Sequence, residues 1–396
     1  MTITSPYGFT AAGVRAGLKS RGKDLALVYN TGPLKHAAAV FTTNTFAAAP
    51  VLWSRQVISD GRADAVVLNS GGANACTGPA GFQDTHTTAE QVAEALSAAG
   101  QDVSATDVLV CSTGLIGERL NMDALLPGVE AAAAALSAEE TPGWDAAHAI
   151  MTTDTVPKTI AVENEAGTFR IGGMAKGAGM LAPGMATMLA VITTDAVISQ
   201  PDLDAALREA VRVSFNRADS DGCMSTNDTV IAMASGAHPN ADQAGVDLEE
   251  FQTLLTEVCM NLAESLINDA EGHRHVIRVT VTNAPSEEDA ETAARAVARS
   301  NLFKTAIYGR DPNWGRILSA VGTTDVAFDP AQVSVSVNGV WVCRNGGIGE
   351  DRSLVDFPPG AQVEVVIDLA AGEAEATILT NDLTHDYVHE NAAYST

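Results

Sequence analysis

The segment Met174–Asp195, with the sequence MAKGAGMLAPGMATMLAVITTD, decides how the chain is interpreted. Its glycine-rich first part contains Lys176, one of only six lysines in the chain, and a Pro-Gly turn separates this part from an apolar run. Residues Thr187–Thr193 are typical of a buried β-strand, because apolar and β-branched side chains dominate them. The segment therefore predicts a strand that begins directly after a tight turn, with a threonine at its first position.

A threonine in this position can act as an autoprocessing nucleophile. The Thr187 hydroxyl would attack the carbonyl carbon of Ala186 and convert the amide into an ester, and hydrolysis would free Thr187 as a new N-terminus. Its α-amine, with a pKa of about 7.7–8, would then serve as the base for its own hydroxyl. From spacing alone, an ordinary threonine in a core strand is the better explanation of the pattern.

Composition restricts the classes of protein that the chain can belong to. It has 396 residues, and 46% of them are hydrophobic, which is enough for a large core divided over two or three domains. The net charge of −26 disfavours a nucleic-acid partner. Five scattered cysteines without a CxxC pair predict no disulfide framework and a reducing cytoplasm. We expect neither a signal peptide nor a membrane-spanning helix.

The chain alternates helical and strand-like patterns, which predicts an α/β or α+β fold. The expected helices are Thr87–Ala99, Met122–Ser137, Gln200–Ser214, Leu248–Asn268 and Asp289–Ser300. The expected strands, besides Thr187–Thr193, are Leu25–Tyr29, Ala65–Leu68, Asp107–Cys111, Thr229–Ala234, Val276–Thr282, Gln332–Val337 and Gln362–Asp368. The polar turn Thr282–Glu288 is the strongest internal boundary, so a smaller C-terminal domain is expected from about 283 to 396.

Two further sequence patterns look like binding motifs, one for a dinucleotide cofactor and one for a metal ion, but neither is complete. Gly177–Ala182 matches the dinucleotide motif GxGxxA, but Pro183-Gly184 follows at once and opposes the helix that such a site needs. His385 and His389, like His273 and His275, have spacings that suit a metal, yet no third ligand accompanies them. We therefore expect no cofactor and no metal site.

The chain resembles the ornithine acetyltransferase (ArgJ) family over nearly its whole length. Lys176–Pro183, Met185–Ala190 and Thr193–Asp195 are similar to the self-cleaving segment of that family. Further blocks follow the family order: Gly8-Phe9 with Ala11–Gly13, Val40–Asn44 (VFTTN), Asn69–Gly78 (NSGGANACTG), Ser112–Gly117 (STGLIG), Met151–Thr155 (MTTDT), Ser225–Thr229 (STNDT), Lys304–Gly309 (KTAIYG), Asp311–Arg316 (DPNWGR) and Asn391–Thr396 (NAAYST).

This resemblance implies a fold and a reaction. The fold is a self-cleaving sandwich of β-sheets flanked by helices, with a smaller C-terminal α/β domain. Cleavage between Ala186 and Thr187 would give an α chain of residues 1–186 and a β chain of residues 187–396, assembled as an (αβ)₂ heterotetramer. The implied enzyme is a cytoplasmic glutamate N-acetyltransferase of arginine biosynthesis. Acetyl would pass from N-acetylornithine to Thr187 and then to glutamate, in a ping-pong mechanism.

The resemblance also implies roles for individual residues. Thr113 and Gly114 occupy the oxyanion positions of the family, although by themselves they suggest only a turn at the end of a strand. Lys176 suits a carboxylate, and Glu271 suits an ammonium group, although Glu271 alone would pass for an exposed carboxylate. The substrate-binding positions are Thr153, Lys176, Thr187, Glu271, Asn391 and Thr396. How Glu271 tolerates the second carboxylate of glutamate is left open by the sequence.

Other functions remain compatible with the same residues. An N-terminal-nucleophile amidase or aminopeptidase would use water instead of glutamate to resolve the acyl-enzyme. An acetyltransferase of secondary metabolism would keep the mechanism and change the substrates. A non-catalytic binding protein would have no need for Thr187, Lys176 and Thr113-Gly114. The sequence also leaves open whether acetyl-CoA is a second donor.

Overall fold

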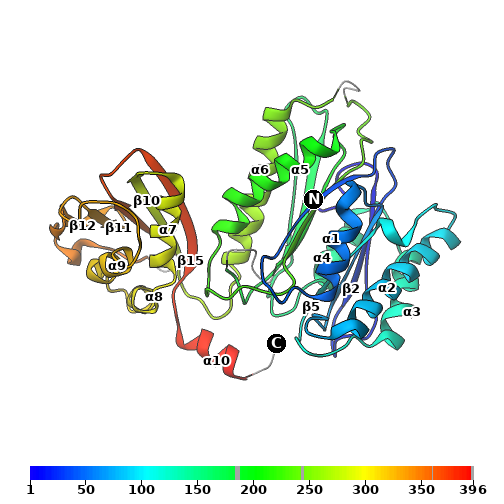
Figure 1. Ribbon diagram of the computed structural model, residues 1–396, viewed down its shortest axis with the longest axis horizontal. Helices are drawn as coiled ribbons and strands as arrows, with labels where there is room; N and C mark the ends of the chain where they lie inside the picture. Colours follow the sequence, from blue (N-terminus) through cyan, green and yellow to red (C-terminus); the bar gives the residue numbers. More distant parts are fainter. Residues whose placement is uncertain (183–187, 242–244, 359, 394–396) are drawn as a thin grey trace.

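The computed structural model describes residues 1–182, 188–241, 245–358 and 360–393. Within these residues the chain is a mixed α/β fold with three sheets and a separate C-terminal lobe, which confirms the expected fold class (Figure 1). The helices are α1 (Ala49–Val57), α2 (Gly78–Ala98), α3 (Met122–Ala134), α4 (Glu140–Ala149), α5 (Gln200–Val213), α6 (Leu248–Ile267), α7 (Glu287–Ala298), α8 (Asn301–Tyr308), α9 (Trp314–Val321) and α10 (His385–Ala393).

Two of the sheets make up the larger lobe. The first has the order β1-β2-β4-β5 and contains β1 (Phe9–Val14), β2 (Leu25–Asn30), β4 (Ala65–Ser70) and β5 (Val108–Thr113). The second has the order β3-β9-β8-β7-β6 and contains β3 (His36–Phe41), β9 (Thr229–Ala234), β8 (Leu189–Thr194), β7 (Arg170–Lys176) and β6 (Lys158–Glu163).

Alternation along β8 explains how the larger lobe is layered. Leu189 and Val191 belong to the core that the second sheet shares with the first sheet and with α2, α3 and α4. Ala190 and Ile192 point the opposite way, into the core under α5 and α6. The second sheet is therefore buried on both faces, with α5 and α6 on one side and the first sheet on the other (Figure 1).

Strand pairing brings distant segments to one end of these sheets. Thr113, the last residue of β5, pairs with Ser70 of the parallel strand β4. Lys176, the last residue of β7, pairs with Leu189 at the start of the antiparallel strand β8. The segment expected to be cleaved thus connects two strands that are already direct neighbours.

The C-terminal lobe has its own sheet and core. The sheet has the order β13-β12-β11-β14-β10-β15 and contains β13 (Gly347–Ile348), β12 (Val340–Arg344), β11 (Ser334–Val337), β14 (Val363–Asp368), β10 (Val276–Ala284) and β15 (Ala374–Asn381). Helix α7 packs on β10 and β15, and α9 packs against α7, within one core of mainly aliphatic side chains. The boundary expected near residue 283 falls at the end of β10, a strand of this same sheet, so the unit around the sheet includes β10.

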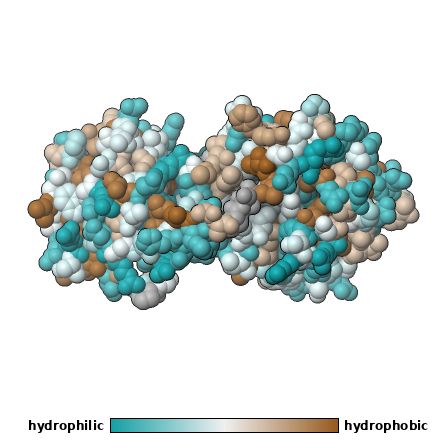
Figure 2. All heavy atoms as spheres, turned by 90° about the horizontal axis from the view of Figure 1, so that it is seen from below, coloured by the Kyte–Doolittle hydropathy of each residue, from teal (hydrophilic) through white to brown (hydrophobic). Residues whose placement is uncertain are grey.

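After β15 the chain returns towards the larger lobe through α10 (Figure 1). Figure 2 shows both lobes from below, with hydrophilic side chains spread over each of them. Among the described residues, no helix has the length and apolar character needed to cross a membrane.

Three local expectations differ from the structure. Strand β8 begins at Leu189 rather than at the expected Thr187. Helix α2 begins at Gly78, nine residues before the expected Thr87, because Pro79 occupies its first turn, where the missing N–H costs nothing. Lys176 does not lie in a glycine-rich loop but ends strand β7, which the sequence did not predict. Gly172 in β7 lets the strand approach the N-terminal segment, since a Cβ there would lie 2.8 Å from the Thr2 carbonyl oxygen.

Candidate active site

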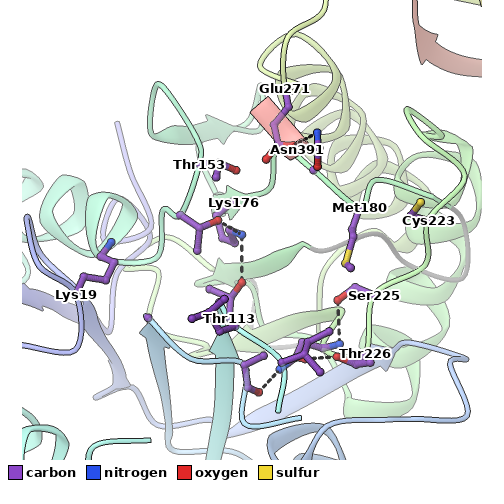
Figure 3. A pocket seen from close by; sticks show the side chains of 18 of the residues that line it. Lys19, Thr113, Thr153, Lys176, Met180, Cys223, Ser225, Thr226, Glu271 and Asn391 are labelled. Atoms are coloured by element: carbon purple, nitrogen blue, oxygen red, sulfur yellow. Dashed lines mark hydrogen bonds between the residues drawn. The ribbon is translucent and has the colours of Figure 1, made fainter. Parts of the chain in front are cut away.

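A cavity of about 680 Å³ lies at the strand ends described above (Figure 3). Its wall combines the N-terminal loop around Lys19, the end of β5, the end of β7, the loop that contains Glu271, and helix α10. The cavity therefore collects residues from almost the whole length of the chain.

Thr113 and Gly114 form a fixed corner of this cavity. The Thr113 carbonyl accepts hydrogen bonds from the N–H groups of Gly71 (2.9 Å) and Gly72 (3.0 Å). Gly114 has a φ of 128°, and a Cβ there would lie 2.6 Å from the Gly72 nitrogen, so only glycine fits. In the described part of the chain, the Gly114 N–H has no acceptor. A hydroxyl and a backbone N–H are thus held side by side at the cavity wall.

Lys176 is buried beside this corner. Its side chain is 1% exposed, and its ammonium donates to the hydroxyls of Thr113 (3.2 Å) and Thr152 (2.7 Å). Burial lowers the pKa of Lys176, although Asp154 opposes the shift. Among the described residues Lys176 has no ion-pair partner within contact distance, so it is a buried cation next to a cavity that an anionic group can enter.

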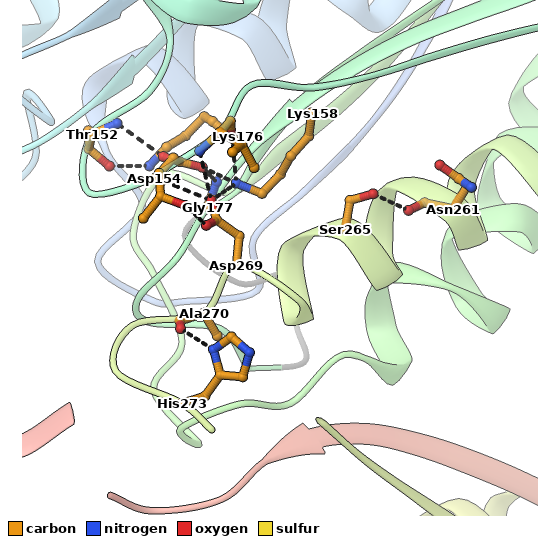
Figure 4. A network of polar contacts seen from close by, with 12 residues as sticks. Thr152, Asp154, Lys158, Lys176, Gly177, Asn261, Ser265, Asp269, Ala270 and His273 are labelled. Atoms are coloured by element: carbon orange, nitrogen blue, oxygen red, sulfur yellow. Dashed lines mark hydrogen bonds and ion pairs between the residues drawn. The ribbon is translucent and has the colours of Figure 1, made fainter. Parts of the chain in front are cut away.

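A network of carboxylates and lysines lies next to Lys176 (Figure 4). Lys158 is buried and lies 2.6 Å from both Asp154 and Asp269. The Gly177 N–H donates to Asp154 at 2.7 Å and so fixes the backbone directly after Lys176. Burial would raise the pKa of the Asp154 carboxyl, but Lys176, Lys158 and the Gly177 N–H outweigh it, and the pKa is lowered.

Glu271 lies on another part of the wall, only 8% exposed. Its backbone N–H donates to the Ala178 carbonyl at 2.9 Å, and its carboxylate accepts from the Asn391 side chain of α10 at 3.0 Å. Gly179 makes room for it, because a Cβ there would lie 2.7 Å from a Glu271 oxygen. This contact joins the C-terminal helix to the glycine-rich segment.

A buried carboxyl lies at the start of β8. One oxygen of Asp228 accepts from the Met188 N–H at 3.0 Å, and the other has no hydrogen-bond partner among the described residues. Burial raises the pKa of Asp228 well above its ordinary range, although the Met188 N–H and Lys176 oppose the shift. Beside it, Asn227 donates to the carbonyls of Ala73 (2.6 Å) and Ser112 (2.8 Å), which ties this loop to the end of β5.

The comparison with protein families identifies the family of the chain. The model of the ArgJ family matches residues 10–396. The chain belongs to the ArgJ family.

Relatives and solved structures are similar to this ArgJ-family chain. It is 59% identical over 398 residues to the arginine biosynthesis bifunctional protein ArgJ of Streptomyces coelicolor, with all of both chains covered, and 57% identical to that of Thermobifida fusca, again in full. Ornithine acetyltransferase from Mycobacterium tuberculosis, solved with ornithine, is 57% identical over 48% of this chain and 96% of that chain (TM-score 0.46). The ArgJ structure from Bacillus halodurans is 34% identical over 48% and 95% (TM-score 0.43).

The structure brings together most of the site residues that the sequence suggested. Thr113, Gly114, Thr153, Lys176, Glu271 and Asn391 all line the cavity. Besides Thr113, the threonine whose hydroxyl accepts a hydrogen bond from Lys176 is Thr152, the neighbour of Thr153. Ala186, Thr187 and Thr396 lie outside the described residues.

Sequence reasoning missed several residues in and around this candidate site. They are Lys19, Thr152, Asp154, Lys158, Asp228 and Asp269. Thr152, Asp154 and Asp228 belong to blocks that carried the family resemblance, so their position in those blocks was an available signal. In the described ranges, no group of three or more His, Cys, Asp or Glu side chains is placed to hold a metal ion.

Proposed function

We propose that this chain is an acetyltransferase of arginine biosynthesis that cuts itself between Ala186 and Thr187 and then transfers acetyl from N-acetylornithine to glutamate through acetyl-Thr187. The observation that carries the proposal is the contact of Lys176 with Thr113 at a cavity that also contains Glu271. The names of the relatives, which are arginine biosynthesis proteins, support the pathway. The neighbouring structure with bound ornithine is consistent with an amino-acid substrate.

The proposed first half-reaction forms an ester. The Thr187 α-amine takes the proton of its own hydroxyl, and the oxygen bonds to the acetyl carbon of N-acetylornithine. The carbonyl oxygen becomes negative and accepts hydrogen bonds from the Thr113 hydroxyl and the Gly114 N–H. When the C–N bond breaks, the proton moves to the departing ornithine amine, and the acetyl group remains on Thr187.

The second half-reaction reverses this chemistry with a different amine. The amino group of glutamate attacks the ester carbon, the same two donors stabilise the second oxyanion, and the proton returns to the Thr187 oxygen. The products are N-acetylglutamate and free enzyme. No oxidant, metal or cofactor is required for the balance of atoms.

The described residues on both sides of the cut support this role. Thr113 and Lys176 precede it, and Glu271 and Asn391 follow it, so both proposed chains contribute to one cavity. We propose two copies of each chain per assembly, which the native mass of the purified protein tests. A cytoplasmic location agrees with the five free cysteines.

Mass spectrometry of the denatured protein tests the proposal. Wild type should give two fragments, the second beginning at Thr187, and incubation with N-acetylornithine alone should add one acetyl group to that fragment. Thr187→Ala should remain a single, unacetylated chain. A wild-type chain that stays intact after prolonged incubation would contradict self-cleavage.

Steady-state kinetics then separates the candidate reactions. Transfer to glutamate predicts parallel lines in double-reciprocal plots of donor and acceptor, as a ping-pong mechanism requires. Release of acetate from N-acetylornithine when no amino-acid acceptor is present would instead favour an amidase. The same assay with acetyl-CoA in place of N-acetylornithine decides whether it is a second donor.

A further inference from the structure

The N-terminal loop holds Lys19 at the cavity through a set of backbone hydrogen bonds. The buried Asp24 carboxylate accepts four successive backbone N–H groups, those of residues 16, 17, 18 and 19, at distances of 2.6–3.0 Å. Gly71 allows this loop to pack closely, because a Cβ there would lie 2.8 Å from the Leu18 carbonyl oxygen. The backbone of Lys19 is therefore fixed from two directions.

The Lys19 side chain is held as well. Its ammonium donates to the Met151 carbonyl at 2.8 Å. An ammonium group has three N–H donors, so two more remain for a ligand in the cavity that Lys19 lines. Half-burial lowers the pKa of Lys19, although Asp24 and Asp154 oppose the shift.

Charges of opposite sign occupy different parts of the cavity wall. The lining includes three cationic residues, Lys19, Arg21 and Lys176, and two acidic ones, Asp221 and Glu271, in a chain whose net charge is −26. In Figure 3, Lys19 and Glu271 are well separated, and Lys176 lies between them in the view. The cavity is thus more positive than the rest of the molecule, and its positive end is the Lys19 loop.

We infer that Lys19 forms a separate subsite for the side-chain carboxylate of the acyl acceptor, while the wall around Glu271 receives the side-chain ammonium of the donor. The inference rests on the proposed function and adds an account of how one cavity binds two substrates with oppositely charged side chains. Ornithine and glutamate share an α-carboxylate and an α-amino group but end in opposite charges. A single subsite at Glu271 would repel glutamate, since like charges at short range disfavour binding. Two subsites of opposite sign remove this conflict without movement of Glu271.

Lys19→Met tests the inference, because it keeps the length and apolar stem of the side chain and removes its charge. Lys19→Arg keeps the charge. Lys23→Met is the matched control, since Lys23 follows in the same segment and contacts the Gly13 carbonyl and Asp145 but does not line the cavity. Each variant is compared with wild type for glutamate and for glutamine, its neutral isostere.

Binding and kinetics give independent results. By calorimetry, wild type should bind glutamate more tightly than glutamine, and Lys19→Met should lose about tenfold or more of that preference, as expected for one charge-assisted hydrogen bond. Lys19→Arg should retain most of the preference, and Lys23→Met all of it. In the acetyl-enzyme assay, Lys19→Met should slow deacetylation by glutamate, while acetylation by N-acetylornithine stays within about twofold.

An unchanged preference for glutamate over glutamine in Lys19→Met would overturn the inference. So would an equal loss in both half-reactions, since that would indicate general damage to the cavity. If wild type forms no acetyl-enzyme, the proposed function fails, and the calorimetric preference still decides whether Lys19 recognises the carboxylate.

Discussion

The ammonium group of Lys176, at the end of β7, donates a hydrogen bond of 3.2 Å to the hydroxyl of Thr113, at the end of β5. An ammonium group cannot accept a hydrogen bond, so the Thr113 oxygen is the acceptor and its own proton is free to point elsewhere. Among the described residues nothing accepts that proton. Lys176 thereby prepares Thr113 as a donor towards the cavity.

Thr113→Val should lower kcat by about 10²–10³, because the oxyanion loses one of two donors while the shape of the side chain is kept. KM should change much less. Thr113→Ser is the control, since it restores the hydroxyl and should recover most of the activity. Steady-state kinetics with N-acetylornithine and glutamate is the measurement. A large rise in KM with normal kcat would instead assign Thr113 to substrate binding.

Removal of the C-terminal segment 391–396 should abolish acetyl transfer but leave folding and cleavage intact. The deletion removes the Asn391 hydrogen bond to Glu271 and opens one wall of the cavity to water. Asn391→Ala alone should produce a smaller effect, mainly a higher KM. A denaturing gel and a transfer assay on the same preparation make the comparison. Full activity of the truncated protein would exclude this segment from the site.

Asp154→Ala should destabilise the protein by roughly 3–5 kcal/mol, because the two buried cations Lys158 and Lys176 then share the single carboxylate of Asp269. Adding Lys158→Met to the same chain should cost further stability, because the carboxylate of Asp269 then loses its buried lysine partner. The exposed pair Asp204 and Arg208 has the same i,i+4 spacing, and Asp204→Ala should cost no more than about 1 kcal/mol. Urea denaturation of all four proteins measures the difference, and equal losses at the two sites would contradict the importance of burial.

Lys304 predicts a dependence of stability on pH. Burial lowers the pKa of this lysine to about 8, although Asp219, Asp221 and Asp382 oppose the shift, and its ammonium contacts the Ser220 carbonyl and the Thr380 hydroxyl. Above pH 8 the folded protein releases the proton while the unfolded chain keeps it up to its ordinary pKa of 10.5. The unfolded state then binds more protons, so stability rises with pH in this window.

Relative to Lys304→Met, wild type should therefore gain roughly 2–3 kcal/mol of unfolding free energy between pH 8 and pH 10.5. The comparison of two proteins cancels the contributions of the other titrating groups. Guanidinium denaturation at several pH values measures it. A constant difference across the window would mean that Lys304 keeps an ordinary pKa in the folded protein.

The sequence predicted several buried strands and missed positions that depend on tertiary contacts. Strands β4, β5 and β9 are apolar on both faces, which makes them recognisable as continuous runs. Strand β7 was missed because Gly172 and Gly173 interrupt its apolar pattern. Both glycines allow close packing against other segments, and those contacts form only in the folded protein. Lys19 was missed for the same reason, since its position depends on four backbone contacts to Asp24.

The order of strands in the second sheet has a consequence for refolding. After the proposed cut, β3, β6 and β7 belong to the first fragment and β8 and β9 to the second, and the two strands of the second lie between strands of the first. The precursor forms this sheet within one molecule, so its folding rate is independent of concentration. Once denatured, the cleaved protein has to form it from two partners, and its recovery then slows on dilution. Maturation would thus make the recovery of the native fold depend on protein concentration.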